Sequence, residues 1–260
     1  MEYSSLLSKK CGVTHFFSTI EGGVGTGTYA TFSLGAYCGD DPQTVAANRK
    51  ILCDGLGIAP DHLIVPHEVH SNDICYIDES YFEKTEEGRL AYLDACDALV
   101  TTLPGVCVAV TTADCVPVLL CDADQRVVMA VHAGWKGVFN GIVPKSIKEM
   151  VSNYGSSLSS IYAVTGPCIS GPFYEVSQDL VDKFATVFPE NEMKAIAHKS
   201  GSSVYLDLRK AVEFQFKNAG IAPEKHEIHP GCTYSQPDRY FSARRQGFYS
   251  GRLLTGIMLK

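Results

Sequence analysis

The sequence predicts an α+β fold in which mixed, largely antiparallel sheets are layered with helices. Short apolar runs typical of buried strands follow one another between residues 97 and 133, with only brief turns between them. Amphipathic segments typical of helices lie on both sides of this region, and strands and helices do not alternate as in a doubly wound fold. The 260 residues are sufficient for a large core, and we expect a single domain over residues 1–260.

In the first half of the chain, the pattern predicts one loop, one helix and four short strands. Residues 21–35 are rich in glycine and threonine and are typical of a loop, but their glycine spacing matches no nucleotide-binding fingerprint. A helix is expected after Asp41, which can cap it, with Pro42 in the first turn and Gly55 or Gly57 at the end. Strands are expected as two short segments within residues 63–78, and at 97–102 and 106–113.

The second half predicts further strands and three helices. The helices are expected at 139–155, 177–188 and 206–220, each with apolar residues at helical spacing. Strands are expected at 116–122, 126–134 and 161–170, and residues 240–260 predict a strand, a basic turn and a second strand.

Charge and composition exclude several classes of partner. The net charge of −7 disfavours nucleic acid and anionic membrane surfaces, and no run of about 18 apolar residues predicts a membrane span. The first residues lack the apolar core of a secretory signal. The ten cysteines are scattered without a CxxC pair, so we expect reduced thiols in a cytoplasmic protein.

The segment TTADCVPVLLCDADQRVVMAVHAGWKG, residues 111–137, predicts a β-hairpin with a polar pair at its open end. If the turn around DADQ is symmetric, Asp122 lies opposite Gln125, and Cys115 then lies opposite His132. Directly opposed Cβ atoms are about 4.5–5.5 Å apart, a gap that a metal held by sulfur and imidazole can span. A three-residue turn would shift the register and separate the two side chains. The alternative is a buried thiol packed against a hydrogen-bonded histidine.

One thiolate and one imidazole are too few ligands for a zinc site, so a third is required. His67 or His70 in PHEVH, and His226 or His229 in HEIH, are available. Residues three apart on a strand face opposite ways, so at most one of each pair can reach a shared metal. Three protein ligands and an open fourth position are typical of catalytic zinc, which lowers the pKa of its bound water to about 7.

Taken together, the motifs resemble those of the YfiH family, whose members are described as polyphenol oxidases, peptidoglycan editing factors or purine nucleoside enzymes. The resemblance runs nearly end to end and is most specific in TADCVPVLL followed by HAGWKG. GDDPQTVAANR, PHEVHS, GPCISGPFYEV and YFSARRQGFYSGR also contribute to it. The resemblance implies a YfiH-like α+β fold.

The resemblance also implies a metal centre and an activity. It implies that His70, Cys115 and His132 bind a catalytic zinc ion, and it thereby selects His70 over His67. The implied reactions are phosphorolysis of adenosine, inosine, guanosine or methylthioadenosine, and hydrolytic deamination of adenosine. The partners would be a small-molecule nucleoside and phosphate.

Such a reaction needs an anion site and a group that moves a proton. Lys136 in GWKG, and Arg244 and Arg245 in SARRQG, are the predicted substrate-binding residues, because arginine matches phosphate with paired donors. The alternative for each is a solvated turn. Asp114, beside Cys115, is the predicted general acid or base, and its alternative is a role in forming a turn or in orienting a ligand.

The chain departs from the family pattern at four places. Ile20 stands where an arginine is expected, Ser33 replaces an asparagine, and Glu68 replaces the glutamine of QVH. Phe173 lies in the segment that usually carries a second cysteine. The predicted zinc ligands are unaffected, so these changes bear on the recognition of phosphate or sugar and hence on substrate preference.

Four other functions compete with a zinc nucleoside enzyme. A multicopper oxidase needs many histidines, commonly as HxH pairs, and the chain has eight with no such pair, so zinc is favoured over copper. A hydrolase would use Cys115 as a free nucleophile and His132 as its base. A non-enzymatic metal-binding protein is the third alternative. The fourth is an editing hydrolase that acts on UDP-muramoyl amino acids, as the family name implies.

Overall fold

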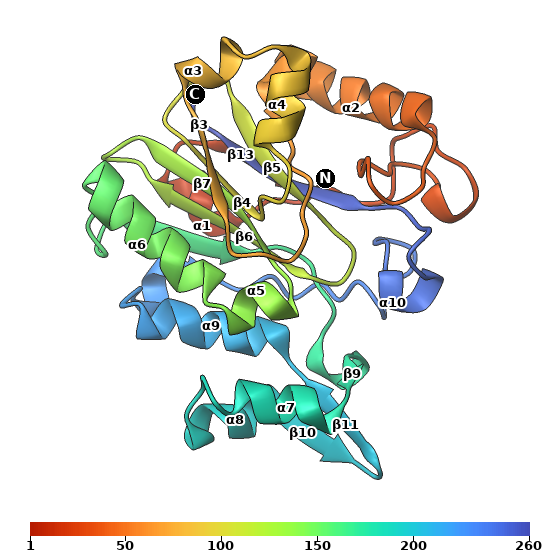
Figure 1. Cartoon of the computed structure of the whole chain (residues 1–260), viewed down its shortest axis with the longest axis vertical. Coiled ribbons are helices and arrows are strands. Elements are labelled where there is room, and N and C mark those ends of the chain that lie inside the picture. Colours follow the sequence, from red (N-terminus) through yellow and green to blue (C-terminus); the bar gives the residue numbers. More distant parts are fainter.

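Two β-sheets packed face to face form the centre of the computed structural model, which describes all residues from 1 to 260 (Figure 1). The larger sheet has the order β12 (His226–Glu227), β8 (Ile161–Thr165), β6 (Val116–Asp122), β7 (Val127–Ala133), β4 (Ala98–Thr101) and β3 (Ile74–Ile77). The smaller sheet has the order β1 (Thr14–Phe17), β13 (Leu253–Met258), β5 (Cys107–Thr112) and β2 (Leu63–Ile64). A separate sheet comprises β10 (Ala197–Ser200), β11 (Ser203–Leu206) and β9 (Glu175–Val176).

The α+β prediction is confirmed by how these strands pair. Seven of the ten strand pairings are antiparallel, and three are parallel, namely β12 with β8, β2 with β5 and β3 with β4. The core between the two large sheets is apolar and contains Val110 of β5, Leu119 of β6 and Val128 of β7. Because β6 and β7 are covered on both faces, every residue of these two strands is buried.

Helices cover the outer faces of both large sheets. Ile147 of α6 and Phe216 of α9 pack with Met129 of β7 on one side, and Leu52 of α2 packs with Ala109 of β5 on the other. The α-helices are α1 (Ser5–Lys10), α2 (Pro42–Leu56), α3 (Glu79–Phe82), α4 (Glu86–Tyr92), α5 (Trp135–Phe139), α6 (Ile142–Tyr154), α7 (Gln178–Phe184), α8 (Glu190–Ile196), α9 (Leu208–Asn218) and α10 (Ala243–Gln246). Short 3₁₀ turns lie at Gly27–Tyr29, Pro60–His62, Gly171–Phe173 and Pro223–Lys225. No helix is long and apolar enough to span a bilayer.

Helix α2 begins and ends where the sequence predicts. The Asp41 carboxylate accepts a hydrogen bond of 3.0 Å from the backbone N–H of Thr44, and Pro42 is the first helical residue. Of the two glycines considered as its end, Gly57 caps the helix with a left-handed φ of 70°.

The predicted register of the hairpin is wrong by two residues. His132 lies opposite Pro117, not opposite Cys115, because four residues rather than two connect β6 to β7. The Asp122 carboxylate accepts hydrogen bonds from two N–H groups of this loop, and Arg126 closes it with φ 49°. A shift by two preserves the alternation of faces, so Cys115 and His132 still project to the same side of the sheet.

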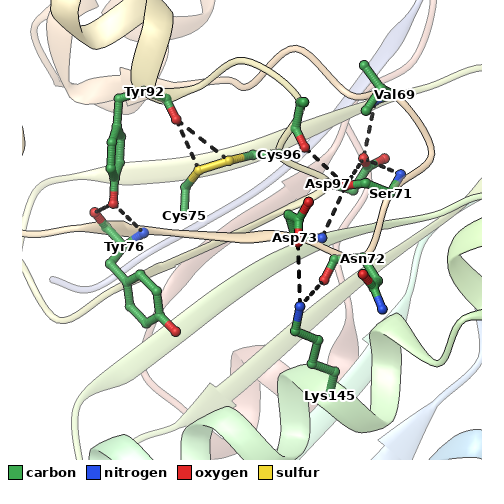
Figure 2. The surroundings of a disulfide bond; sticks show 11 residues. Val69, Ser71, Asn72, Asp73, Cys75, Tyr76, Tyr92, Cys96, Asp97 and Lys145 are labelled. Atoms are coloured by element: carbon green, nitrogen blue, oxygen red, sulfur yellow. Dashed lines mark hydrogen bonds and ion pairs between the residues drawn. A yellow bond between two sulfur atoms is a disulfide. The ribbon is translucent and has the colours of Figure 1, made fainter.

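Two other expectations are wrong. The basic segment near the C-terminus forms the short helix α10 after an irregular stretch, so β13 is its only strand. The cysteines are not all reduced, since Cys75 at the start of β3 forms a disulfide with Cys96 (Figure 2). This bond joins β3 to the turn before β4, next to Asp97.

Candidate metal centre

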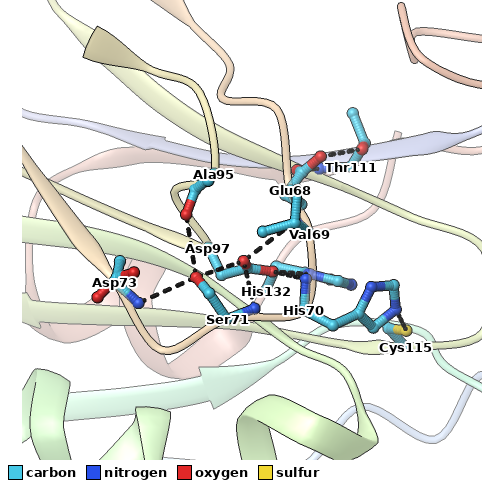
Figure 3. A network of polar contacts seen from close by, with 10 residues as sticks. All are labelled: Glu68, Val69, His70, Ser71, Asp73, Ala95, Asp97, Thr111, Cys115 and His132. Carbon is cyan, nitrogen blue, oxygen red and sulfur yellow. Dashed lines mark hydrogen bonds and ion pairs between the residues drawn. The ribbon is translucent and has the colours of Figure 1, made fainter.

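Three side chains from three separate segments meet at one end of the larger sheet. His70, Cys115 and His132 each offer a ligand atom, and these atoms all lie within 4.8 Å of one another. The Cys115 Sγ atom is 3.6 Å from Nε2 of His70, and the two imidazole rings are 4.9 Å apart, edge to face (Figure 3). Two nitrogens and one sulfur at such spacing form a donor set that fits a single metal ion.

The backbone brings these groups together at positions of unusual conformation. His132 is near the end of β7, Cys115 directly precedes β6, and His70 lies in the loop before β3 with a left-handed φ of 64°. Gly134 has no side chain, and the side chains of His70 and Cys115 occupy the space beside it. A Cβ atom there would collide with the His70 ring and lie 3.2 Å from the Cys115 sulfur.

Asp97 organises both histidines, and the sequence analysis did not assign it a role. One carboxylate oxygen accepts hydrogen bonds from His132 Nδ1 at 2.7 Å and from the backbone N–H of His70 at 3.0 Å. The other accepts from the N–H groups of Val69 and Ser71, at 3.2 and 2.7 Å, and from the Ser71 hydroxyl at 2.8 Å (Figure 3). Because Nδ1 of His132 is used in this way, its Nε2 is left to serve as the ligand atom.

Charge interactions favour a ligand-ready thiolate. Burial by itself would raise the pKa of Cys115, but the neighbouring imidazoles of His132 and His70 lower that pKa to about 6. Burial would lower the pKa of His132, yet the Cys115 sulfur and the Asp97 carboxylate hold it well above its ordinary value. Burial likewise opposes ionisation of Asp97, but hydrogen bonds from His132 and Ser71 lower its pKa. Cys115 is therefore largely deprotonated at neutral pH, the state that metal binding requires.

The three residues line a cavity of about 420 Å³, a size suited to a small-molecule ligand. Glu68 lies in its wall and accepts hydrogen bonds from the N–H and hydroxyl of Thr111, at 2.6 and 2.8 Å. Burial raises the pKa of this carboxyl group. Its other charged and aromatic side chains are Tyr37, Asp114, Trp135, Tyr174, Arg244, Phe248 and Arg252.

Asp114 lines the cavity, but both of its oxygens are already engaged. One accepts a hydrogen bond from the Thr233 hydroxyl and the other from the backbone N–H of Arg244, each at 2.6 Å. Its backbone has a positive φ of 98°, unusual for a residue other than glycine. Contacts of this kind suit a turn-forming or ligand-orienting role, the alternative to the predicted acid or base.

Of the three predicted substrate-binding cations, one lies in the cavity wall. The guanidinium of Arg244 donates to the Glu175 carbonyl at 2.8 Å and lies 5.1 Å from the centre of the Tyr174 ring. Arg245 points away from the cavity, where its guanidinium donates to the carbonyls of Thr233, Tyr234 and Tyr240. Lys136 is exposed on α5 and lies outside the cavity lining.

The other histidines considered as third ligands have different partners. His67 is bonded through Nδ1 to Asp94 at 2.7 Å and stacks against Tyr37. His229 pairs with Glu2 at 2.9 Å, and His226 Nδ1 lies 3.1 Å from the Ala222 carbonyl. The structure therefore places only His70 beside Cys115 and His132.

Comparison with known proteins identifies the family. Residues 14–260 match the family described as multi-copper polyphenol oxidoreductase laccase. The chain belongs to this family, also called YfiH. A YfiH protein of Bacillus licheniformis has a crystal structure that superposes with a TM-score of 0.89 at 28% identity, covering 96% of this chain and 93% of that one.

YfiH relatives with enzyme names include the following two. A protein of Bacteroides thetaiotaomicron named purine nucleoside phosphorylase is 34% identical over 97% of this chain and 94% of its own length. A protein from an unknown prokaryotic organism named adenosine deaminase is 34% identical over 94% of this chain and 93% of its own length. The family therefore includes proteins named for two different reactions of purine nucleosides.

Proposed function

We propose that this protein is a zinc-dependent purine nucleoside enzyme. The proposed reactions are phosphorolysis of adenosine, inosine, guanosine or methylthioadenosine, and deamination of adenosine. The observation that carries the proposal is the group His70, Cys115 and His132 in the wall of a cavity that also contains Arg244. The names of the YfiH relatives support this choice of substrate.

The donor set supports zinc as the metal. Zinc binds two imidazoles and one thiolate with a fourth position left open, and Asp97 supplies the carboxylate that such a histidine commonly contacts. A mononuclear copper centre with the same donors commonly adds a methionine, and no methionine lines the cavity. When bound, zinc supplies Lewis acidity, which polarises an oxygen and lowers the pKa of water.

The side chains of the cavity suit the two proposed reactions. In phosphorolysis, a phosphate oxygen forms a bond to C1′ of the ribose, and the purine leaves with the electron pair of the glycosidic bond and takes up a proton. The Arg244 guanidinium, with donors free beyond its bond to Glu175, would hold the phosphate. Asp114 would fix the backbone of Arg244 in place. Deamination replaces the amino group of adenine by a water oxygen and releases ammonia.

A thiol hydrolase is a second candidate because of the lowered pKa of Cys115. A free thiolate beside an imidazole is the arrangement of cysteine hydrolases. A thiolate bound to zinc is not a free nucleophile, so the two functions require different states of the same group. Alkylation of Cys115 by iodoacetamide at the same rate with and without zinc would favour the hydrolase.

The decisive experiment incubates the zinc-loaded protein with adenosine, with and without phosphate, and separates the products by chromatography. We expect adenine and ribose 1-phosphate only when phosphate is present. Inosine should form in both cases, and with phosphate part of it should be converted to hypoxanthine. Cys115→Ala should abolish both activities and zinc retention. Arg244→Gln should reduce phosphorolysis more than deamination, whereas the matched control Lys136→Gln should change neither. Absence of turnover with every purine nucleoside would refute the proposal.

A further inference from the structure

Two aromatic side chains at the cavity mouth have no role in holding a metal or an anion. Tyr37 and Phe248 both line the cavity, and they are 50% and 61% exposed. They come from segments that are distant in sequence, one before α2 and the other after α10. Large aromatic surface left open to solvent at the entrance of a pocket is typical of a ligand contact.

The ring of Tyr37 is held in its orientation by a contact with His67. Its ring lies 4.0 Å from the His67 ring at an interplanar angle of 31°, and His67 is itself held by a 2.7 Å bond to Asp94. His67 therefore supports the tyrosine ring instead of the metal centre. A ring held in this way loses little rotational freedom when a ligand packs against it.

The backbone of Phe248 is also held in place. Its carbonyl accepts a hydrogen bond of 3.0 Å from the Arg252 guanidinium, which lies 5.6 Å from the centre of the phenylalanine ring. Arg252 also donates to the carbonyls of Ser250 and Gly251. This guanidinium, which itself lines the cavity, thus stabilises the segment that carries Phe248. Phe248 also contacts Tyr249, but most of its surface remains open to a ligand.

We propose that Tyr37 and Phe248 form the base-binding part of the site and select a planar heterocycle by stacking. This inference rests on the proposed function, which places a purine in the same cavity. An aromatic side chain presents a flat face on which any base can stack, whatever the substituents on its ring. For phosphorolysis, a base at the mouth would let the ribose and phosphate extend toward Arg244 and the His70–Cys115–His132 group, and would place the glycosidic bond between them.

The test compares Tyr37→Leu and Phe248→Leu with wild-type protein by equilibrium binding of adenine and, separately, of ribose 1-phosphate. Each substitution should weaken adenine binding roughly 5- to 150-fold, which corresponds to about 1–3 kcal/mol for a lost base stack. Binding of ribose 1-phosphate should change less than about twofold. Tyr37→Phe should retain adenine binding. Tyr3→Leu is the matched control, since Tyr3 is a 62% exposed aromatic residue that lies outside the lining of this cavity.

The outcomes separate this inference from the proposed function. Unchanged adenine binding in both leucine variants would overturn the inference, and so would an equal loss of both ligands. If wild type turns over nucleosides but the variants show the same KM, only the inference fails. If adenine binding depends on Tyr37 and Phe248 but no nucleoside is turned over, the proposed reactions fail and the base site stands.

Discussion

Replacing Asp97 by asparagine tests whether the metal centre depends on a single supporting carboxylate. The change keeps the size of the side chain but replaces one oxygen by an NH₂ group. With the remaining oxygen facing His132, the N–H groups of Val69 and Ser71 lose their acceptor. With the amide flipped, the donors of His70 and His132 lose theirs.

The size of the effect follows from these contacts. At least two donors lose their acceptor in either orientation, and a fully buried unpaired donor costs about 1–3 kcal/mol. The donors of Val69, His70 and Ser71 are only partly buried, so the free energy of unfolding should fall by about 2–4 kcal/mol. Loss of a carboxylate that supports a histidine ligand typically weakens metal binding about 10- to 100-fold, or about 1.4–2.7 kcal/mol. Since a domain of this kind has about 5–15 kcal/mol of stability, the variant should remain folded at low temperature.

Zinc affinity is measured by competition with a chromophoric chelator, and stability by urea unfolding of the metal-free protein. Asp94→Asn is the matched control, because Asp94 is exposed and contacts His67 instead of a ligand. The pKa of Asp97 is lower in the folded protein than in the unfolded chain. The ionised carboxylate therefore contributes fully to stability above the ordinary aspartate pKa of about 3.9, and this contribution is lost as the pH falls through the lower pKa of the folded state. The stability difference between wild type and Asp97→Asn should therefore shrink in acid. Zinc binding within twofold of wild type would show that the carboxylate does not support the site.

Three further changes should have measurable effects. In the metal-free protein, the rate of Cys115 alkylation should rise with pH around the lowered pKa of about 6. Buried Cys168, whose pKa is raised to about 11, should stay unreactive and serves as the control. A midpoint near pH 9 for Cys115 would contradict the proposed charge interactions. Replacing Cys75 and Cys96 by serine should lower the free energy of unfolding by about 3 kcal/mol, since the bond closes a loop across 21 residues, and dithiothreitol should then have no further effect on the melting temperature. Asp114→Ala should raise the KM for phosphate at least several-fold through the loss of two hydrogen bonds to the carboxylate, and an unchanged KM would exclude its positioning role.

Local patterns predicted the longer helices and the central strands, because the causes of these elements are local. Asp41, Pro42 and Gly57 bound α2 as expected, since caps and turns depend on a few adjacent residues. The basic stretch around Arg244 and Arg245 does not form the predicted turn between strands. Ser242 caps a short helix there by accepting a hydrogen bond from the N–H of Arg245, and the pattern of charges gave no sign of it.

In the hairpin of β6 and β7, the predicted register was wrong, but the predicted proximity of Cys115 and His132 was right. A four-residue loop held by the Asp122 side chain displaced the register by two, yet Cys115 and His132 still face the same side because side chains alternate with a period of two. A displacement by one residue would have separated them. His70 could not be chosen over His67 by spacing, and the family resemblance supplied that choice.

The sequence by itself determined the fold class, the longer helices, the central strands and the residue types available to hold a metal, because these follow from periodicity, capping and donor chemistry. Only the tertiary structure decided which residues share the site. Asp97 lies across from His132 because β4 pairs with β7, and Tyr37 reaches the cavity because it packs on His67. Arg244 and Arg245 are adjacent in sequence, but only Arg244 lines the cavity. Such contacts join segments distant along the chain, and no local pattern encodes the direction in which each side chain finally points.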